Sequence, residues 1–203
     1  MKILDLIQGS SEWLAVRRQY VTASEMASVL KVPGAYKSRS MLMKHKLHGE
    51  PEPSAYTANL FARGHMAEAG LTKDAEEMLG MPFQSLVAVH EEHGILASFD
   101  NINLEHGVIV ETKNCISEKK LELARDFKVW EPYRVQILTQ MLVANVRIGF
   151  MLMRDENTDE LHLVPVSPDE VTTKRIIEET AQFTKELSEA RKAMTVTPEE
   201  MKA

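Results

Sequence analysis

The sequence has 203 residues, of which 44% are hydrophobic and 27% charged, and these proportions exclude a disordered or fibrous chain. Its single cysteine, Cys115, excludes an internal disulfide and a cysteine-rich zinc module. The net charge of −6 excludes a protein that coats nucleic acid by bulk attraction, but not an enzyme that cuts nucleic acid with metal-binding carboxylates. No apolar run reaches about 18 residues and no signal peptide is recognisable, so we expect a cytoplasmic protein without a membrane partner.

The first part of the chain is predicted to be mainly helical. The serine pair at 10–11 can cap a first helix that continues to Tyr20. The segment 22–25 has the spacing of a capping box and predicts a second helix. A basic stretch covers 37–48, and a longer helix is expected over 55–79, where apolar residues recur at helical spacing.

The second part changes to short segments that are rich in β-forming residues and separated by turns. Three of these segments are expected to be consecutive antiparallel strands: 83–90, 95–99 and 108–112. The elements expected after them are a helix from Pro132 to about 145, a strand pair at 146–153 and 161–166, and a final helix over 167–194. This order predicts one mixed α/β domain over 1–195, followed by a polar tail over 196–203.

The residues expected to carry chemistry are Asp100, Glu111 and Lys113. Glu111 and Lys113 are two residues apart at the end of a predicted strand, so their side chains point to one face about 6.5 Å apart. Asp100 closes the preceding strand, and a hairpin can bring its carboxylate beside that of Glu111. Two neighbouring carboxylates repel each other unless a cation lies between them, and a hard divalent ion would bind there with oxygen ligands. The main-chain carbonyl of Thr112 is a further candidate ligand, and Lys113 can orient or deprotonate an attacking water.

A purely structural interpretation of these residues is also open. Glu-x-Lys occurs twice more in the sequence, and an exposed pair of this kind contributes well under 1 kcal/mol. The metal site is favoured because the apolar strand 108–110 delivers the charges where a buried strand ends. Glu68 in the long helix and Gln136 in the helix after Pro132 can reach the same ions, although each alone is typical of a solvated helical face.

Several short motifs follow one another along residues 9–153: Trp13-x-x-x-Arg17, Thr22-Ala23-Ser24, Arg63-Gly64 with Glu68, Ser98-x-Asp100, Glu111-x-Lys113 and Tyr133-x-x-Gln136. In this order they resemble the YqaJ-type viral recombinase, or phage lambda exonuclease, family of the PD-(D/E)xK nuclease superfamily. The resemblance implies a restriction-endonuclease-like α/β core, with a mixed twisted sheet flanked by helices, that forms a single nuclease domain over 1–195.

By this resemblance, the chain would be a 5′-to-3′ exonuclease that uses Mg²⁺, or Mn²⁺ in its place, to degrade one strand of linear double-stranded DNA. The remaining 3′ strand would pass to a phage single-strand annealing protein, and the enzyme would form a trimeric ring in a bacterial host. The metal ligands would be Asp100, Glu111, Glu68 and the carbonyl of Thr112. Lys113 would be the catalytic lysine, assisted by Gln136 and Glu68. A second glutamine of many members is replaced by Leu138.

The resemblance also implies a pocket for the 5′ phosphate, formed by Arg17, Ser24 and Ser98. A helix capped by Thr22 would place Ser24 in its first turn, where free N–H groups favour an anion, and the guanidinium of Arg17 suits phosphate. Without the resemblance, a capped helix is the favoured explanation of Thr22 and Ser24, and a surface charge that of Arg17. An arginine that completes the pocket in some members has no clear counterpart, and Lys37 or Arg39 could replace it on a basic track for DNA.

Other functions remain open from the sequence. One is another deoxyribonuclease of the superfamily, either an endonuclease or a single-strand-specific enzyme, and another is a catalytically silent module that binds DNA ends. The residues His90-Glu91-Glu92-His93, with His106 and Cys115, also invite a zinc site. We expect no such site, because a strand and turn should not converge these ligands as a helical motif does. A glycine-rich phosphate loop is absent from the sequence, so nothing indicates an ATPase motor.

Overall fold

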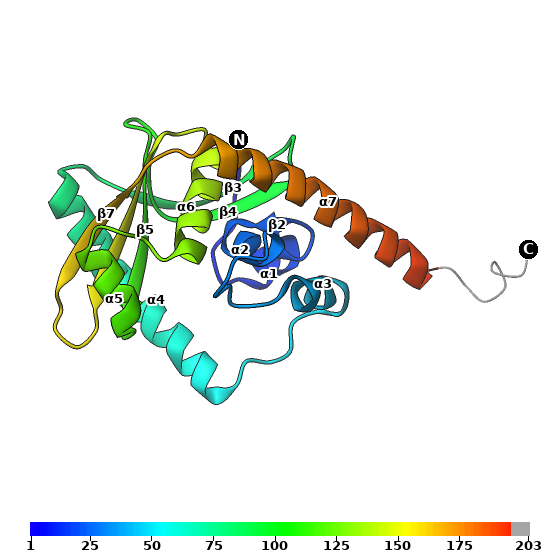
Figure 1. Ribbon diagram of the computed structural model, residues 1–203, viewed down its shortest axis with the longest axis horizontal. Coiled ribbons are helices and arrows are strands. Elements are labelled where there is room, and N and C mark those ends of the chain that lie inside the picture. The colour runs from blue at the N-terminus through cyan, green and yellow to red at the C-terminus, as the bar shows by residue number, and fades with distance from the viewer. Residues whose placement is uncertain (196–203) are drawn as a thin grey trace, which may run out of the picture.

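This computed structural model describes residues 1–195, apart from the side chains of Phe61 and Thr195, and within that range seven strands form one mixed sheet (Figure 1). The strand order is β1-β3-β4-β5-β6-β7, and β2 pairs with β4 outside this path. The polar tail predicted for 196–203 lies outside the described residues. The strands are β1 (Lys2–Leu4), β2 (Val21–Thr22), β3 (Gln84–His90), β4 (Ile95–Asn103), β5 (Val108–Cys115), β6 (Ile148–Asp155) and β7 (Leu161–Val166).

Neighbouring strands are antiparallel, except that β5 pairs in parallel with β6 and β2 in parallel with β4. The chain crosses from β5 to β6 through two helices, as a parallel pairing requires. The helices are α1 (Ser11–Arg17), α2 (Met26–Val29), α3 (Arg39–His48), α4 (Ala55–Leu79), α5 (Glu118–Arg125), α6 (Glu131–Ala144) and α7 (Glu170–Thr195), and a 3₁₀ turn, η1 (Ala23–Glu25), precedes α2.

Helices cover both faces of the sheet, and β5 shows how the faces are assigned. Val108 and Val110 pack on the side of α4, against Leu71 and its neighbours. Ile109, between them, packs on the side of α6 in the main core. Because side chains alternate along a strand, Glu111 follows Ile109 onto the α6 side.

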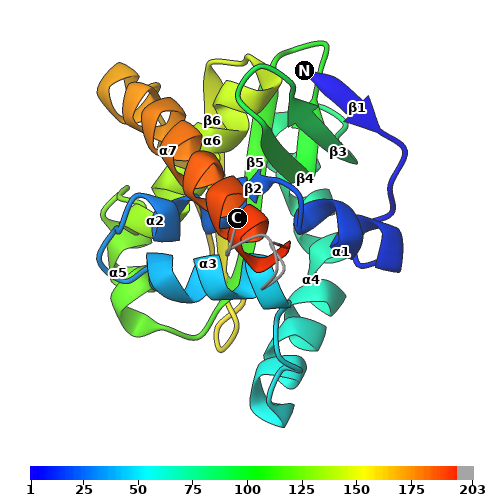
Figure 2. The same ribbon diagram turned by 90° about the vertical axis from the view of Figure 1, so that its right-hand side faces the viewer.

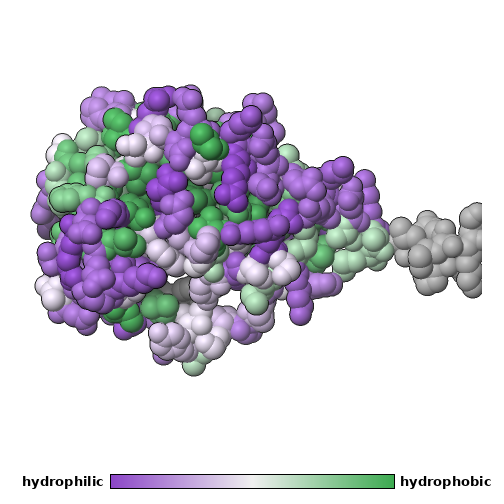
Figure 3. Space-filling model, viewed as in Figure 1, coloured by the Kyte–Doolittle hydropathy of each residue, from purple (hydrophilic) through white to green (hydrophobic). Residues whose placement is uncertain are grey.

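The last helix packs on the domain itself, which its sequence pattern did not decide. Ile176, Phe183 and Leu187 of α7 are buried in the main core, and α7 contacts α2, α3 and α6. Figure 2 shows α7 crossing these elements, and Figure 3 shows hydrophilic residues along its outer side. Among the described helices, none is long and apolar enough to cross a membrane.

The structure confirms the predicted mixed sheet and the long helix, and it corrects three local boundaries. The first helix ends at Arg17 rather than at Tyr20. The capping box at 22–25 opens only the short η1 and α2. Asp100 does not close its strand, because β4 continues to Asn103 and Asp100 lies within it. The position of Asp100 within β4 determines how the candidate site is built.

Candidate active site

One pocket of about 150 Å³ collects most of the residues that the sequence predicts for the site. The edge of β4 changes partner here, because β2 pairs with Ile95 and Leu96 whereas β5 pairs from Asn101 onwards. The stretch of β4 between these two pairings supplies one side of the pocket. Of the predicted residues, the pocket is lined by Arg17, Ser24, Ser98, Asp100, Glu111, Lys113 and Gln136.

A β-bulge in β4 accounts for the direction of Asp100. Between Phe99 and Ile102, β4 has one residue more than the segment of β3 that pairs with it. The extra residue reverses the alternation of side chains, so Phe99 and Ile102 both enter the main core although they are three residues apart. Asp100 lies inside this bulge and lines the pocket, where its Oδ2 accepts a 3.3 Å hydrogen bond from Thr112 Oγ1.

Both carboxylate oxygens of Glu111 are held in place. Glu111 is only 2% exposed. Lys113 Nζ lies 2.5 Å from its Oε1, and Gln140 Nε2 donates to its Oε2 at 2.6 Å. The same amide nitrogen of Gln140 lies 3.3 Å from the main-chain oxygen of Ser98, so Gln140 links β4 to β5 beside the pocket.

The charges of the pocket are unbalanced. Burial and the nearby Glu111 carboxylate raise the pKa of Asp100 from its ordinary value of 3.8 to about 7. Burial alone would lower the pKa of Lys113, but the carboxylates of Glu111 and Asp100 outweigh burial and raise it. Lys113 is therefore a firmly held cation, and one ammonium group faces two carboxylates.

These donors fit a hard divalent cation. Asp100 and Glu111 offer oxygen ligands in one pocket, and burial together with the Glu111 carboxylate disfavours the ionised form of Asp100, a penalty that a bound cation would offset. Glu68 does not line the pocket: it is half exposed on α4 and bonded to His65 Nδ1 at 2.9 Å. Its charge nevertheless acts on Asp100. Ligation by Glu68 and by the carbonyl of Thr112 stays a prediction.

Gln140, beside the pocket, and Gln8, which lines it, were not predicted from the sequence. The family pattern would place a second glutamine at position 138, where Leu138 is a buried core residue. Gln136 and Gln140 are four residues apart in α6, so they lie one turn apart on the same helix face. Gln136 lines the pocket, and Gln140, 1% exposed, bonds Glu111 behind it. The helical spacing of the two glutamines was the signal that could have identified Gln140.

The opposite wall of the pocket comes from the start of the chain. The pairing of Thr22 with Leu96 in the parallel ladder of β2 and β4 brings the following residue pair, Ser24 and Ser98, to the same pocket. Trp13 Nε1 donates to Ser98 Oγ at 2.9 Å. The guanidinium of Arg17 lies 4.4 Å from the centre of a Trp13 ring and 3.5 Å from Ser24 Oγ. Trp13 therefore supports two residues of this wall as well as packing in a small apolar cluster.

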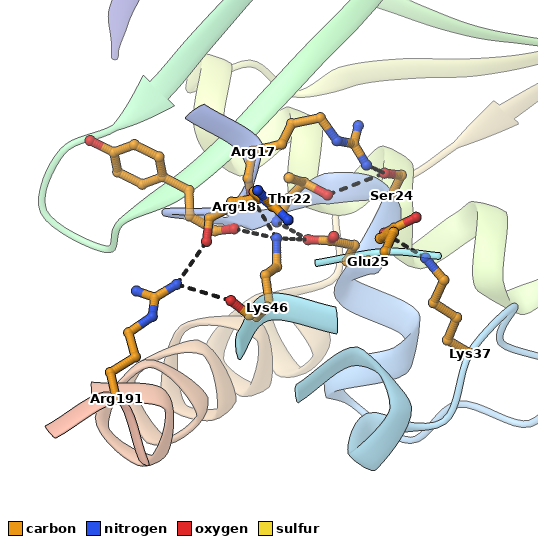
Figure 4. A network of polar contacts seen from close by, with 10 residues as sticks. Arg17, Arg18, Thr22, Ser24, Glu25, Lys37, Lys46 and Arg191 are labelled. Atoms are coloured by element: carbon orange, nitrogen blue, oxygen red, sulfur yellow. Dashed lines mark hydrogen bonds and ion pairs between the residues drawn. The ribbon is translucent and has the colours of Figure 1, made fainter. Parts of the chain in front are cut away.

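A buried lysine fixes this wall from behind (Figure 4). Lys46 of α3 is 7% exposed, and its Nζ donates to the main-chain oxygens of Arg17 at 2.6 Å and Tyr20 at 2.7 Å. It also pairs with Glu25 at 2.7 Å, and the same Glu25 oxygen accepts the N–H of Thr22 at 3.0 Å. Burial lowers the pKa of Lys46, against the opposing effect of Glu25. The ammonium group of Lys46 thus contacts both the last residue of α1, Arg17, and the last residue of η1, Glu25.

The structure does not bring Lys37 and Arg39 into the pocket. Lys37 pairs with Glu50 at 2.7 Å, and Arg39 pairs with Glu186 of α7 at 2.5 Å. Arg39 therefore joins α3 to α7, and Lys37, which precedes α3, joins the segment that follows this helix. Arg17 lines the pocket, and neither Lys37 nor Arg39 does.

Comparison with known proteins agrees with this geometry. Residues 12–147 match the YqaJ-like viral recombinase domain, which is more than half of the chain. The chain belongs to the YqaJ-like viral recombinase family. The matched region contains every residue of the pocket that the sequence analysis predicted. No curated protein sequence matches the chain significantly.

Solved structures share the fold of this family member at low sequence identity. An alkaline exonuclease from Laribacter hongkongensis, LHK-Exo, superposes with a TM-score of 0.77 at 21% identity, covering 91% of this chain and 96% of that one. The structure of LHK-Exo in complex with dAMP gives a TM-score of 0.75 at 20% identity with the same coverage. A phage-related exonuclease from Haemophilus somnus gives 0.67 at 13% identity, covering 87% of this chain and 96% of that one.

The raised pKa of Asp100 predicts a pH-dependent effect of Asp100→Asn on stability. Folding takes up a proton at Asp100 between about pH 4 and pH 7, so this group makes the metal-free parent less stable as pH rises through that window. Asn carries no charge, and its stabilising effect should be larger at pH 8 than at pH 5 by on the order of 2 kcal/mol. Urea unfolding in EDTA measures this difference, and equal effects at both pH values would contradict the charge imbalance.

Gln140→Met should weaken divalent metal binding by about 10-fold or more, because Met fills the same volume but cannot donate to Glu111. Mn²⁺ binding followed by electron paramagnetic resonance gives the affinity. Gln182→Met, which changes an exposed glutamine on α7, is the matched control and should bind Mn²⁺ like the parent. Parental Mn²⁺ affinity in Gln140→Met would show that the bond to Glu111 does not position the carboxylate.

Proposed function

We propose that the protein is a Mg²⁺-dependent 5′-to-3′ exonuclease that degrades one strand of linear double-stranded DNA. The observation that carries the proposal is one pocket shared by a carboxylate pair with a lysine, Asp100, Glu111 and Lys113, and by a wall with an arginine and two serines. Membership of the recombinase family supports it, as does the fold shared with proteins described as exonucleases.

Asp100 and Glu111 would hold the metal, with Mn²⁺ as a substitute for Mg²⁺. When bound, such ions would activate the attacking water and stabilise the leaving 3′ oxygen. Lys113 keeps its proton at neutral pH, because its pKa is raised, so it orients water and offsets phosphate charge rather than acting as a base. Gln136 lines the same pocket and can hold a water or a phosphate oxygen. The ring of Tyr133, 5.7 Å from Lys113 Nζ, supports the ammonium.

The second wall supports end-directed cleavage over cleavage within a strand. Arg17 offers a planar guanidinium to a phosphate, and Ser24 and Ser98 offer hydroxyl groups beside it. A 5′-terminal phosphate bound there would lie next to the carboxylates, so that the scissile bond would follow the terminal nucleotide. The complex of LHK-Exo with dAMP, a single nucleotide, is compatible with a pocket of this kind in the relative.

Membership of the family supports a biological setting for this reaction. The 3′ single strand left by digestion would be handed to a phage single-strand annealing protein for recombination. A trimeric ring around the DNA would keep the enzyme on its substrate between cleavage events. The annealing protein and the ring would act on the DNA before and after cleavage, whereas the pocket would act at one DNA end.

The decisive experiment is digestion of end-labelled linear duplex DNA with and without Mg²⁺. The parent should release mononucleotides only with Mg²⁺, and Lys113→Met should reduce the rate at least 10³-fold, because the cation beside the carboxylates is lost. Lys119→Met, at an exposed lysine nearby, should digest like the parent. Cleavage of closed circular or single-stranded DNA would instead indicate another nuclease of the superfamily, and Mg²⁺-independent end binding without cleavage would indicate a silent module.

Arg17→Ala should remove a preference for 5′-phosphorylated ends. The charge-assisted bond to phosphate contributes about 1.5–3 kcal/mol, so the parent should digest phosphorylated ends at least 10-fold faster than hydroxyl ends. Arg18→Ala changes the neighbouring exposed arginine and should keep that preference. Equal rates of the parent on both kinds of end would remove the reason for a phosphate site at Arg17.

A further inference from the structure

The turn between β3 and β4 brings three potential metal ligands together, although the sequence analysis did not expect it. His90 ends β3, and Glu92 and His93 lie in the turn before β4. One ligand atom from each residue lies within 4.8 Å of the other two. In the part of the chain that the structure describes, His106 and Cys115 do not join this group. The expectation that a strand and turn would not converge such ligands is therefore wrong for His90, Glu92 and His93.

The reason is that the turn is helical. Gly94 N donates to His90 O at 2.8 Å, and Gly94 adopts a left-handed conformation with φ of +62°. A bond from residue i+4 to residue i closes one turn of helix, which places His90 and His93, three residues apart, on the same side. The two imidazole rings are stacked with their centres 4.5 Å apart. An extended strand and a tight two-residue turn would have separated them.

We propose that His90, Glu92 and His93 bind one transition-metal ion of the Zn²⁺ class. Two imidazoles and one carboxylate are typical ligands of Zn²⁺, Ni²⁺ and Co²⁺, whereas Mg²⁺ prefers oxygen ligands alone. His90 Nδ1 also supports a bound ion, because this nitrogen is buried and has no hydrogen-bond partner among the described residues. Coordination at about 2.1 Å requires the ligand atoms to approach each other, and rotation of the exposed Glu92 and half-exposed His93 side chains provides that movement.

This site is separate from the carboxylate pocket. None of its three residues lines that pocket, and Asp100 lies five residues beyond the start of β4, roughly 17 Å along an extended strand. The ion would join the end of β3 to the turn that leads into β4. Its expected effect is on the stability of the strand pair that carries Ser98 and Asp100.

Isothermal titration of the untagged full chain with Zn²⁺ tests the proposal, in an Asp100→Asn background so that the carboxylate pocket does not compete. We expect one equivalent of Zn²⁺ and a thermal unfolding midpoint that rises with Zn²⁺. His93→Ala and His93→Gln should each weaken binding at least 10-fold, while His106→Ala, at an exposed histidine outside the group, should bind like the parent.

Substitution by Co²⁺ gives an independent signal, because visible absorption reports nitrogen coordination, and this absorption should disappear in His93→Gln. Binding that is unchanged in both His93 variants, or no Zn²⁺ binding at all by the Asp100→Asn protein, would overturn the proposal. Loss of nuclease activity in other experiments would leave this test intact, because its measurements are metal binding, absorption and unfolding.

Discussion

The candidate site depends on an excess of negative charge in a buried place. Asp100 and Glu111 share the pocket with one ammonium group, that of Lys113, and the local structure prevents any of the three from turning away. Above about pH 7, where Asp100 loses its proton, a buried negative charge without a partner remains, and such a charge is costly. A divalent cation would remove the excess, so the proposed metal would complete the site rather than only occupy it.

The rest of the domain serves to hold two distant parts of the chain around that charge. The short ladder of β2 with β4 sets the wall at 22–24 beside β4, and Lys46 ties this wall to α1 through main-chain oxygens. On the other side, α6 supplies Gln140 to Glu111. The Gln140 contact is buried and the Lys46 contacts are partly buried, so these supports of the pocket lie beneath its surface.

The sequence predicted the elements and the residues of the pocket better than the local geometry that unites them. Glu111 and Lys113 could be placed on one face, because alternation along a strand is regular. The bulge at Asp100 could not be predicted, since one additional residue in a strand leaves no periodic pattern. The pairing of Lys37 and Arg39 with Glu50 and Glu186 also depends on tertiary packing.

The same limit explains the histidine turn and Gln140. Four residues between two strands are compatible with several turn types, and this one is closed by the bond from Gly94 N to His90 O with Gly94 in a left-handed conformation. Gln140 has a clear helical relation to Gln136, but sequence periodicity does not show which buried residue a glutamine will meet. Local patterns thus identified chemical groups, whereas contacts between segments determined which groups act together.

The bulge in β4 makes the site sensitive to the length of the chain. With one residue fewer between Phe99 and Ile102, the regular alternation of side chains would resume. Asp100 could then no longer line the proposed metal site while Phe99 stays in the core. A single-codon deletion here would therefore silence the chemistry while the sheet and its hydrophobic layers persist. Such a deletion would separate the two properties: the fold would remain, and the proposed activity would be lost.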